Sequence, residues 1–275
     1  MVQFKRVPIQ FSGTLRYWSS EDVGMSAGYA CLSVDEIRSS MEKKGTRVIL
    51  AADLFTISEI SNILNEVGSH ICMLKTHVDG IQDFDLDRWM NEVVGPARKM
   101  GVLLFEDRKF ADIGYVSKIQ MLGHQRIAEW ADVVTAHRIS GPDIVEGIHD
   151  AWRECGRKGA VAVLAQMSSS GNLLDEEYCR KVVDSCREID GVCGFIGNGS
   201  NPDNISELRG LVGGAKMILT PGINLNSGEA RMGQRYGHPK EAIAAGSDAV
   251  IVGSGIIRNA KPLTAAVKYA KEASV

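Results

Sequence analysis

Short apolar runs alternate with longer amphipathic stretches along most of the chain. Eight runs rich in Val, Ile and Leu occur at residues 47–53, 70–76, 101–107, 131–137, 160–167, 191–197, 216–222 and 248–255. They are continuous rather than alternating, which is typical of parallel strands buried on both faces. The segments between them, such as 57–68, 85–100 and 175–189, carry apolar residues at helical spacing. The pattern therefore predicts eight strands separated by helices.

Eight strand–helix units predict a (β/α)8 TIM barrel of the α/β class. A further helix at 33–43 is expected before the first strand. The alternative is a doubly wound open sheet. Eight strand signals and the lack of an early GxGxxG turn both argue against it. No low-complexity linker divides the chain, so we expect residues 31–275 to form one catalytic domain. Residues 1–30 lack an apolar signal core with a cleavage site and are expected to form an N-terminal arm.

Composition narrows the function classes. The chain has 275 residues, of which 44% are hydrophobic, so it can bury one large core. A formal net charge of −3 gives no basic field for a nucleic-acid backbone, and no apolar run reaches the roughly 20 residues needed to span a bilayer. The six cysteines are scattered without a CxxC pair. We therefore expect reduced, partly buried thiols of a cytoplasmic protein rather than zinc ligands.

Polar residues cluster where the predicted strands end. These residues are Asp53, Lys75, His77, Asp107, Lys109, His137 and Ser168. The carboxyl ends of barrel strands are where the chemistry of this fold lies. The densest group is LFEDRKFADIG, in which Asp107 and Lys109 project to the same side of the strand and Asp112 follows a turn. The alternative is a solvated strand end with weak surface ion pairs, but the companion charges on the first two strands favour a site.

The buried-looking Lys75 needs a partner if it points inward. Asp53, at the end of the neighbouring strand, is a suitable one. The alternative is that Lys75 extends to the solvent with its ammonium group. We expect His77 and His137 to be hydrogen-bonding residues and predict no metal site.

The last two strands end in LTPGIN and VGSG. Glycines there let backbone amides approach a ligand closely, and the loops after strands seven and eight of barrels often form a phosphate site. Gly253 and Gly255 would supply amides. In GQRYGHP, the side chains of Gln234, Arg235 and Tyr236 could reach the same anion.

The block LFEDRKFADIG resembles the signature of the orotidine 5′-monophosphate decarboxylase family. The blocks CMLKTHVD, RIAEWADVVTAH, MSSSGNL, LTPGIN, GQRY and GSDAVIVG are similar to that family's other blocks, in the same order, from about Val48 to Ile257. The similarity is closest to the eukaryotic-type branch. It implies a carboxy-lyase of a pyrimidine nucleotide that uses neither cofactor nor metal, in a homodimer with active sites at the subunit interface.

The resemblance also implies roles for individual residues. Asp53 would hold a ribose hydroxyl, and Lys75 would link the ribose to the charges. Asp107 and Lys109 would flank the scissile carboxylate, with Lys109 stabilising and protonating the C6 carbanion. Asp112 would come from the partner subunit. The remaining implied substrate contacts are His77, Ser168, Pro221, Gln234, Tyr236, Gly253 and Ser254.

Three positions depart from the family pattern. Ser254 stands where the family has a phosphate-binding arginine, and a hydroxyl replaces a permanently charged bidentate donor. Arg258 or Arg235 could compensate. Val116 stands where a threonine would reach a ribose hydroxyl, and valine cannot make that hydrogen bond. Thr135 replaces an asparagine, which we expect to be a minor change.

The charged catalytic positions are retained while the ribose-phosphate side is altered. The first hypothesis is that the protein decarboxylates orotidine 5′-monophosphate to UMP in de novo pyrimidine biosynthesis. The alternative is a related barrel acting on a different or unphosphorylated carboxylated heterocycle or nucleoside. A third reading is a non-catalytic nucleotide-binding homologue.

Overall fold

The structure is a computed structural model that describes residues 31–169, 171–226 and 236–274. All eight predicted strands form: β1 (Val48–Ala51), β2 (Met73–Thr76), β3 (Leu103–Phe110), β4 (Val133–Ala136), β5 (Ala160–Leu164), β6 (Val192–Ile196), β7 (Met217–Thr220) and β8 (Ala249–Val252). The helices are α1 (Val34–Lys44), α2 (Ile57–Val67), α3 (Leu86–Trp89), α4 (Gly95–Lys99), α5 (Gly114–Leu122), α6 (Ile127–Trp130), α7 (Asp143–Glu154), α8 (Glu176–Cys186), α9 (Pro202–Val212), α10 (Pro239–Ala244), α11 (Ser254–Ile257) and α12 (Pro262–Glu272). The 3₁₀ turns η1 (Gly68–His70) and η2 (Val78–Gly80) and the π-helical segment η3 (Met90–Val94) complete them.

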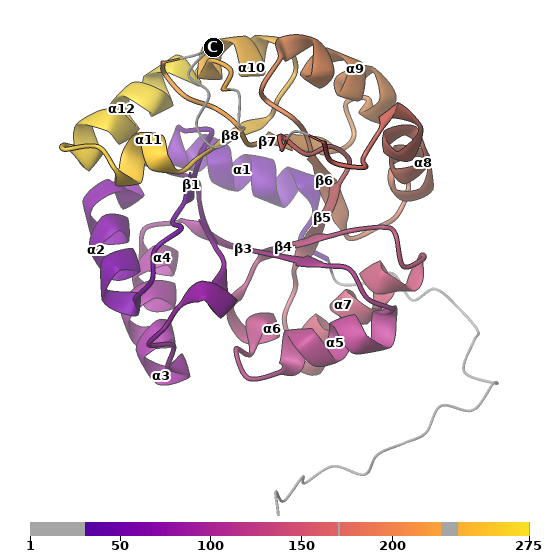
Figure 1. The fold of residues 1–275 in the computed structure, drawn as a ribbon. Coiled ribbons are helices and arrows are strands. Elements are labelled where there is room, and N and C mark those ends of the chain that lie inside the picture. The colour runs from indigo at the N-terminus through magenta and orange to yellow at the C-terminus, as the bar shows by residue number, and fades with distance from the viewer. Residues whose placement is uncertain (1–30, 170, 227–235, 275) are drawn as a thin grey trace, which may run out of the picture.

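The strands form a closed parallel barrel in chain order. Each strand pairs with the next, and β8 pairs with β1, with Ile49 opposite Ile251. Figure 1 shows helices around the outside of the strands and α1 across one end. The predicted barrel is therefore confirmed, and the open sheet is excluded. The N-terminal arm expected at 1–30 lies outside the described residues.

Local chemistry explains where two of the predicted helices begin and break. The helix expected at 33–43 is α1, which begins at a capping box between Ser33 and Glu36. The helix expected at 85–100 divides into α3, η3 and α4. Pro96 lies in the first turn of α4 and has no N–H to donate to the preceding turn. The π-helical segment precedes this missing hydrogen bond.

Side chains of each strand alternate between an inner layer, which fills the barrel, and an outer layer between strands and helices. Along β3, Phe105 packs in the inner layer with Ile49, whereas Leu104 and Phe110 belong to the outer layer. The same alternation directs Asp107 inward, at the C-terminal end of the barrel.

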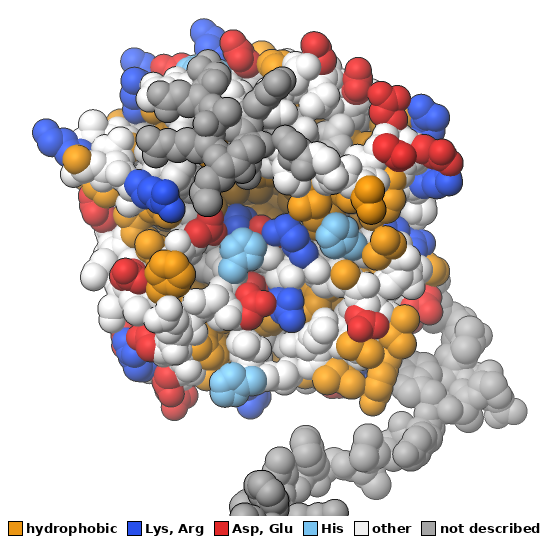
Figure 2. Space-filling model, in the orientation of Figure 1, with side chains coloured by type: hydrophobic (Ala, Val, Ile, Leu, Met, Phe, Trp, Pro, Cys, Tyr) orange, Lys and Arg blue, Asp and Glu red, His pale blue; other side chains and the backbone are white. Residues whose placement is uncertain are grey.

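The inner layer changes from apolar to polar at this end. Lys75 and Thr135 follow the inner-layer residues Met73 and Val133 by two positions on β2 and β4, which flank β3. In Figure 2, acidic, basic and histidine side chains gather at the centre of this face. The barrel therefore carries its charged residues at the C-terminal mouth.

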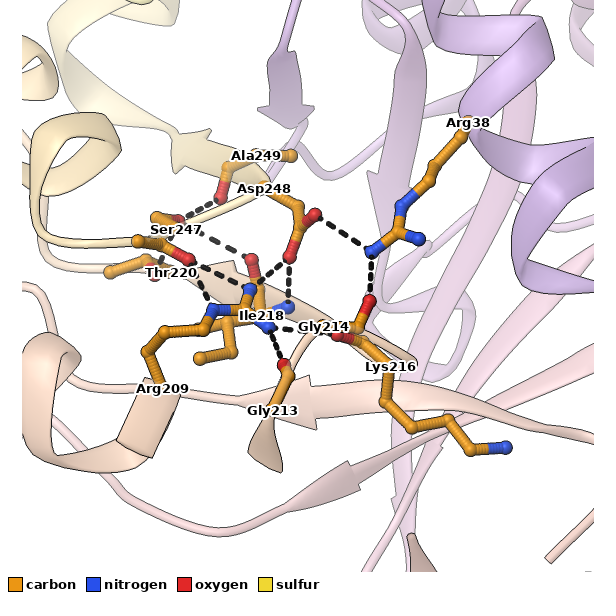
Figure 3. Close-up of polar contacts among 11 residues, drawn as sticks. Arg38, Arg209, Gly213, Gly214, Lys216, Ile218, Thr220, Ser247, Asp248 and Ala249 are labelled. Atoms are coloured by element: carbon orange, nitrogen blue, oxygen red, sulfur yellow. Dashed lines mark hydrogen bonds and ion pairs between the residues drawn. The ribbon is translucent and has the colours of Figure 1, made fainter. Parts of the chain in front are cut away.

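The opposite end of the barrel is closed by α1. The side chains of Ile37 and Met41 pack against the inner layer. Arg38 donates a hydrogen bond to the Gly214 carbonyl (3.0 Å) and pairs with Asp248 (3.3 Å), which also pairs with Arg209 (Figure 3). These contacts hold α1 against the N-terminal ends of the strands. A cavity of about 320 Å³ lies beside them, and none of the charged residues at the C-terminal mouth lines it.

The six cysteines are free thiols. Burial raises the pKa of Cys72 and of Cys193 to about 12, so both are neutral at pH 7. In the described part of the chain, no helix combines the length and apolar character needed to cross a membrane.

Candidate active site

The charged residues at the ends of β1, β2 and β3 form one connected array. Lys75 Nζ lies 2.9 Å from Asp107 Oδ2, and Lys109 Nζ lies 2.8 Å from the same oxygen. Asp53 Oδ1 lies 3.6 Å from Lys75 Nζ. The Lys75 side chain is only 6% exposed, so it points inward instead of extending to solvent. The array, defined as Asp53, Lys75, Asp107 and Lys109, thus alternates acid and base.

The backbone of β3 is irregular at Lys109. The register against β4 shifts between Glu106 and Phe110, and Lys109 has a left-handed backbone with φ of 53°. Such a conformation costs a non-glycine residue about 1–3 kcal/mol. The Lys109 amide donates a hydrogen bond of 2.9 Å to Thr135 Oγ1, and the Thr135 hydroxyl donates one of 2.8 Å to Asp107 Oδ1. The strained backbone therefore belongs to Lys109, one of the two lysines paired with Asp107.

The array fixes the charge of Asp107. Burial alone would raise the pKa of this carboxyl, but the ammonium groups of Lys75 and Lys109 outweigh it and lower the pKa to about 2. Asp107 is therefore ionised at neutral pH. It presents a permanent negative charge next to both lysines.

His77 contacts the array without lining the pocket beside it. Its Nε2 lies 2.9 Å from Lys75 Nζ and 3.4 Å from Asp107 Oδ2. Burial and the Lys75 charge lower the pKa of His77, so its ring is neutral at pH 7 and accepts a hydrogen bond from Lys75. Burial and the Lys109 charge likewise lower the pKa of His137. Within the described ranges, no three His, Cys, Asp or Glu side chains are placed to hold a metal ion.

A pocket of about 580 Å³ opens beside the array. This volume lies in the range of roughly 300 to 1,000 Å³ that is usual for small-molecule sites. All four residues of the array line it, and its apolar lining includes Ala51, Phe105, Leu164, Ile196 and Ile251. The pocket therefore combines apolar walls with a charged end and has the size of a small-molecule site.

Most of the predicted substrate contacts line this same pocket. They are Asp53, Lys75, Ser168, Pro221, Tyr236, Gly253 and Ser254. A methyl group on Gly253 would lie at ordinary contact distance from the Ala51 carbonyl oxygen (3.4 Å) and from Asp53 Oδ2 (3.6 Å), so the end of β8 lies beside the array. Gln234 and Arg235 lie outside the described residues.

Arg258 also lines the pocket, one helical turn after Ser254. Its amide donates a hydrogen bond of 3.2 Å to the Ser254 carbonyl. Lys75 and Lys109 are both paired with Asp107, whereas Arg258 makes no ion pair with any residue in the described ranges. Its guanidinium is therefore the lining cation that remains available to an anionic ligand group.

Asp112 lies away from this pocket, in the exposed turn between β3 and α5. Its Oδ1 accepts a hydrogen bond from the Ile113 amide (2.8 Å), and its carbonyl accepts hydrogen bonds from the hydroxyls of Ser117 (3.1 Å) and Ser140 (2.8 Å). It forms no ion pair with a residue in the described part of the chain. The described structure therefore does not bring Asp112 together with the array.

Sequence reasoning missed two residues of the site. Gln166 lines the pocket just beyond β5, held by hydrogen bonds with the Asn204 carbonyl (3.3 Å) and the Asn198 amide (3.0 Å). The sequence feature that could have identified Gln166 is a polar residue directly after an apolar strand. Thr135 was treated as a minor substitution, although its inward position two residues after Val133 could have identified it.

Comparisons with known proteins show which proteins this chain is similar to. A family model described as "Orotidine 5'-phosphate decarboxylase / HUMPS family" matches residues 46–269. The chain is 40% identical over 236 residues to uridine 5′-monophosphate synthase of Bos taurus, covering 85% of this chain and 47% of that relative, so it spans about half of the bovine protein. It is 35% identical to orotidine 5′-phosphate decarboxylase of Torulaspora delbrueckii, covering 84% and 87% of the two chains. The crystal structure of orotidine 5′-phosphate decarboxylase from Pyrococcus horikoshii OT3 superimposes with a TM-score of 0.65 at 25% identity, covering 83% and 99%.

Proposed function

Because the chain belongs to the orotidine 5′-phosphate decarboxylase/HUMPS family, we propose that it converts orotidine 5′-monophosphate to UMP in pyrimidine biosynthesis. The observation that carries this proposal is the array at the pocket, in which Lys75 and Lys109 flank one buried carboxylate oxygen of Asp107. In this proposal the pyrimidine ring packs against the apolar lining, and its carboxylate lies at Lys109.

We propose that side chains at the barrel mouth carry out the reaction. The bond between C6 and the carboxylate breaks, CO₂ leaves, and the electron pair stays on C6. The Lys109 ammonium, held beside that carbon, stabilises the developing charge and then gives its proton to C6. The neutral amine that results takes a proton from water.

Asp107 has two roles in this mechanism. Its permanent charge fixes the ammonium groups of Lys75 and Lys109 before the substrate enters, so little reorganisation is needed during the reaction. It also repels a substrate carboxylate placed beside it, and that repulsion is relieved when CO₂ leaves. Asp53, beside Lys75, would accept a hydrogen bond from a ribose hydroxyl.

The phosphate of the substrate would lie near Tyr236, Gly253, Ser254 and Arg258. We propose that Arg258 supplies the positive charge that Ser254 lacks, because it lines the same pocket and is unpaired among the described residues. Phosphate binding remote from the reacting carbon would orient the ring.

We propose that the active form is a homodimer with shared active sites. Ile113, Tyr115 and Ile119 are 50–69% exposed, and Ile139 is 73% exposed. Ser140 and Asp112 are hydrogen-bonded, so these apolar residues surround the turn that carries Asp112. Figure 2 shows hydrophobic side chains on this part of the face. A second copy packed here would bury the patch and bring Asp112 to its neighbour's mouth.

We further propose a cytoplasmic location. The free thiols, which include Cys31 and Cys155 as half-buried side chains, suit a reducing compartment.

The proposal is tested by mixing the protein with orotidine 5′-monophosphate and following the loss of absorbance. We expect turnover, and we expect Lys109→Ala to lower it at least about a thousand-fold, because one group supplies both stabilisation and the proton. Lys43→Ala, at the exposed end of α1, is the matched control and should leave the rate unchanged. No turnover by the unmodified protein would overturn the proposal.

A second candidate substrate is a carboxylated pyrimidine or nucleoside without the 5′-phosphate. The observation in its favour is Ser254, a hydroxyl in the part of the pocket assigned to the phosphate. In that case UMP would not raise the melting temperature, and the unphosphorylated nucleoside would be turned over instead. Tight UMP binding without any turnover would identify a binding protein.

A further inference from the structure

Thr135 connects the two central residues of the array. Its side chain is fully buried on β4 and does not line the pocket. A threonine hydroxyl has one proton to donate and lone pairs to accept. Here it donates to Asp107 Oδ1 (2.8 Å) and accepts from the Lys109 amide (2.9 Å). One hydroxyl thus contacts both the carboxylate and the backbone that carries the ammonium.

The two oxygens of Asp107 are divided between different partners. Oδ2 lies within 2.9 Å of the ammonium nitrogens of both Lys75 and Lys109, and Oδ1 accepts the hydrogen bond from Thr135. If the hydroxyl were absent, nothing else among the described contacts would hold Oδ1, and the carboxylate could rotate about its Cβ–Cγ bond. Rotation would move Oδ2 away from one lysine.

The second contact acts on the strained part of β3. Lys109 has a left-handed backbone inside the register shift, and its amide hydrogen bond to Thr135 joins this turn to β4. Without the acceptor, the Lys109 backbone would be free to relax toward ordinary strand geometry. That change would re-aim the ammonium group.

We infer that Thr135 is a positioning residue that fixes the Asp107 carboxylate and the Lys109 backbone in their catalytic orientation. The expected effect of Thr135 on kcat rests on the proposed decarboxylation. It concerns a position that the sequence pattern marked only as a minor departure from the family.

The structure provides a matched control on the neighbouring strand. Thr76 on β2 is also fully buried, and its hydroxyl donates a 2.7 Å hydrogen bond to the carboxyl group of Glu106 on β3. It lies in the outer layer, away from the pocket. Thr76→Val and Thr135→Val therefore remove the same chemical group from equally buried positions, one outside the site and one within it.

The experiment compares Thr135→Val, Thr135→Ser and Thr76→Val in the full-length protein. We expect Thr135→Val to lower kcat about 10- to 100-fold with KM changed less than about threefold, because the ammonium is displaced from the transition state while the ligand contacts remain. Thr135→Ser keeps the hydroxyl and should retain most of kcat. Thr76→Val should lower the melting temperature and leave kcat unchanged. A Thr135→Val variant that behaves like Thr76→Val, with normal kcat, would overturn the inference.

A second measurement does not depend on the substrate. Native-state hydrogen exchange of the Lys109 amide should be about tenfold or more faster in Thr135→Val, because its acceptor is gone, and should stay slow in Thr135→Ser. Unchanged exchange would refute the inference even if turnover were altered. Absence of turnover in the unmodified protein would refute the proposed function alone, and the exchange result would still decide the role of Thr135.

Discussion

Two adjacent carboxyl groups in β3 have opposite pKa shifts because they face opposite layers. Glu106 is fully buried in the outer layer, and burial raises its pKa to about 8, although Thr76 and the Val78 amide donate hydrogen bonds to it. Asp107 faces the inner layer, where the lysines lower its pKa to about 2. Strand alternation thus separates a neutral acid in the outer layer from a charged one at the pocket.

The raised pKa of Glu106 predicts a pH dependence of stability. The folded-state pKa of about 8 lies above the ordinary value of 4.5 for a glutamate. The contribution of Glu106 to stability is therefore complete below about pH 4.5 and is lost as pH rises through about 8. We expect the free energy of unfolding to fall between pH 5 and pH 8 by a few kcal/mol more in the unmodified protein than in Glu106→Gln. Urea denaturation at both pH values measures this difference.

The control for that comparison is Glu42→Gln, which changes an exposed carboxylate of α1. It should leave the pH dependence as it is in the unmodified protein. Equal pH dependence in Glu106→Gln and the unmodified protein would mean that Glu106 is ionised in the folded state.

The phosphate assignment gives a prediction for two neighbouring positions. Arg258→Gln should raise KM for orotidine 5′-monophosphate about tenfold or more, because a charge-assisted contact is lost. Ser254→Arg should lower KM by restoring a second cation. Steady-state kinetics measure both, with Arg47→Gln as a control at the opposite end of the barrel. An unchanged KM in Arg258→Gln would show that this guanidinium does not bind the phosphate.

At the scale of elements, the apolar runs located every strand, but not the irregularities that aim the side chains. Each observed strand lies within its predicted run except β3, which extends to Phe110 through the register shift. A charged run such as Asp107 to Lys109 gives no periodic signal for a bulge, because hydrophobic alternation stops there. For the same reason the left-handed backbone of Lys109 could not be predicted.

The packing of α5 on α7 is likewise not encoded in hydrophobic periodicity. A methyl group on Gly147 of α7 would overlap the Gly114 carbonyl, and one on Gly114 would overlap the Asp143 carbonyl. The two helices approach so closely that only glycine fits at their contact. The close contact between α5 and α7 also positions the turn that contains Asp112, because α5 begins immediately after that turn.

We therefore expect Gly147→Ala to destabilise the protein by about 1–3 kcal/mol, since backbone atoms must move to admit the methyl group. Gly210→Ala is the matched control. It lies in α9, where a methyl group would meet no heavy atom within 4 Å, and should stabilise the protein by up to about 1 kcal/mol. Chemical denaturation measures both changes, and a neutral Gly147→Ala would show that the contact can relax.

At the scale of the whole molecule, closure of the barrel makes a site from residues distant in sequence. Asp53 and Gly253 are 200 positions apart, yet β1 and β8 are paired neighbours and both residues line the pocket. The order of strands made this juxtaposition predictable. For Asp112, strand order alone predicts no place in the pocket, and its expected position at a partner's site comes from the family resemblance.

Subunit complementation tests that assembly. Lys109→Ala and Asp112→Ala should each be inactive alone if every site takes Lys109 from one protomer and Asp112 from the other. When the two variants are mixed and allowed to exchange subunits, half of the dimers should be mixed, and one of the two sites in each should carry both native residues. The mixture should therefore recover about a quarter of the unmodified activity per site. If both residues acted within one chain, no mixed dimer would contain an intact site, and the mixture would stay as inactive as its components.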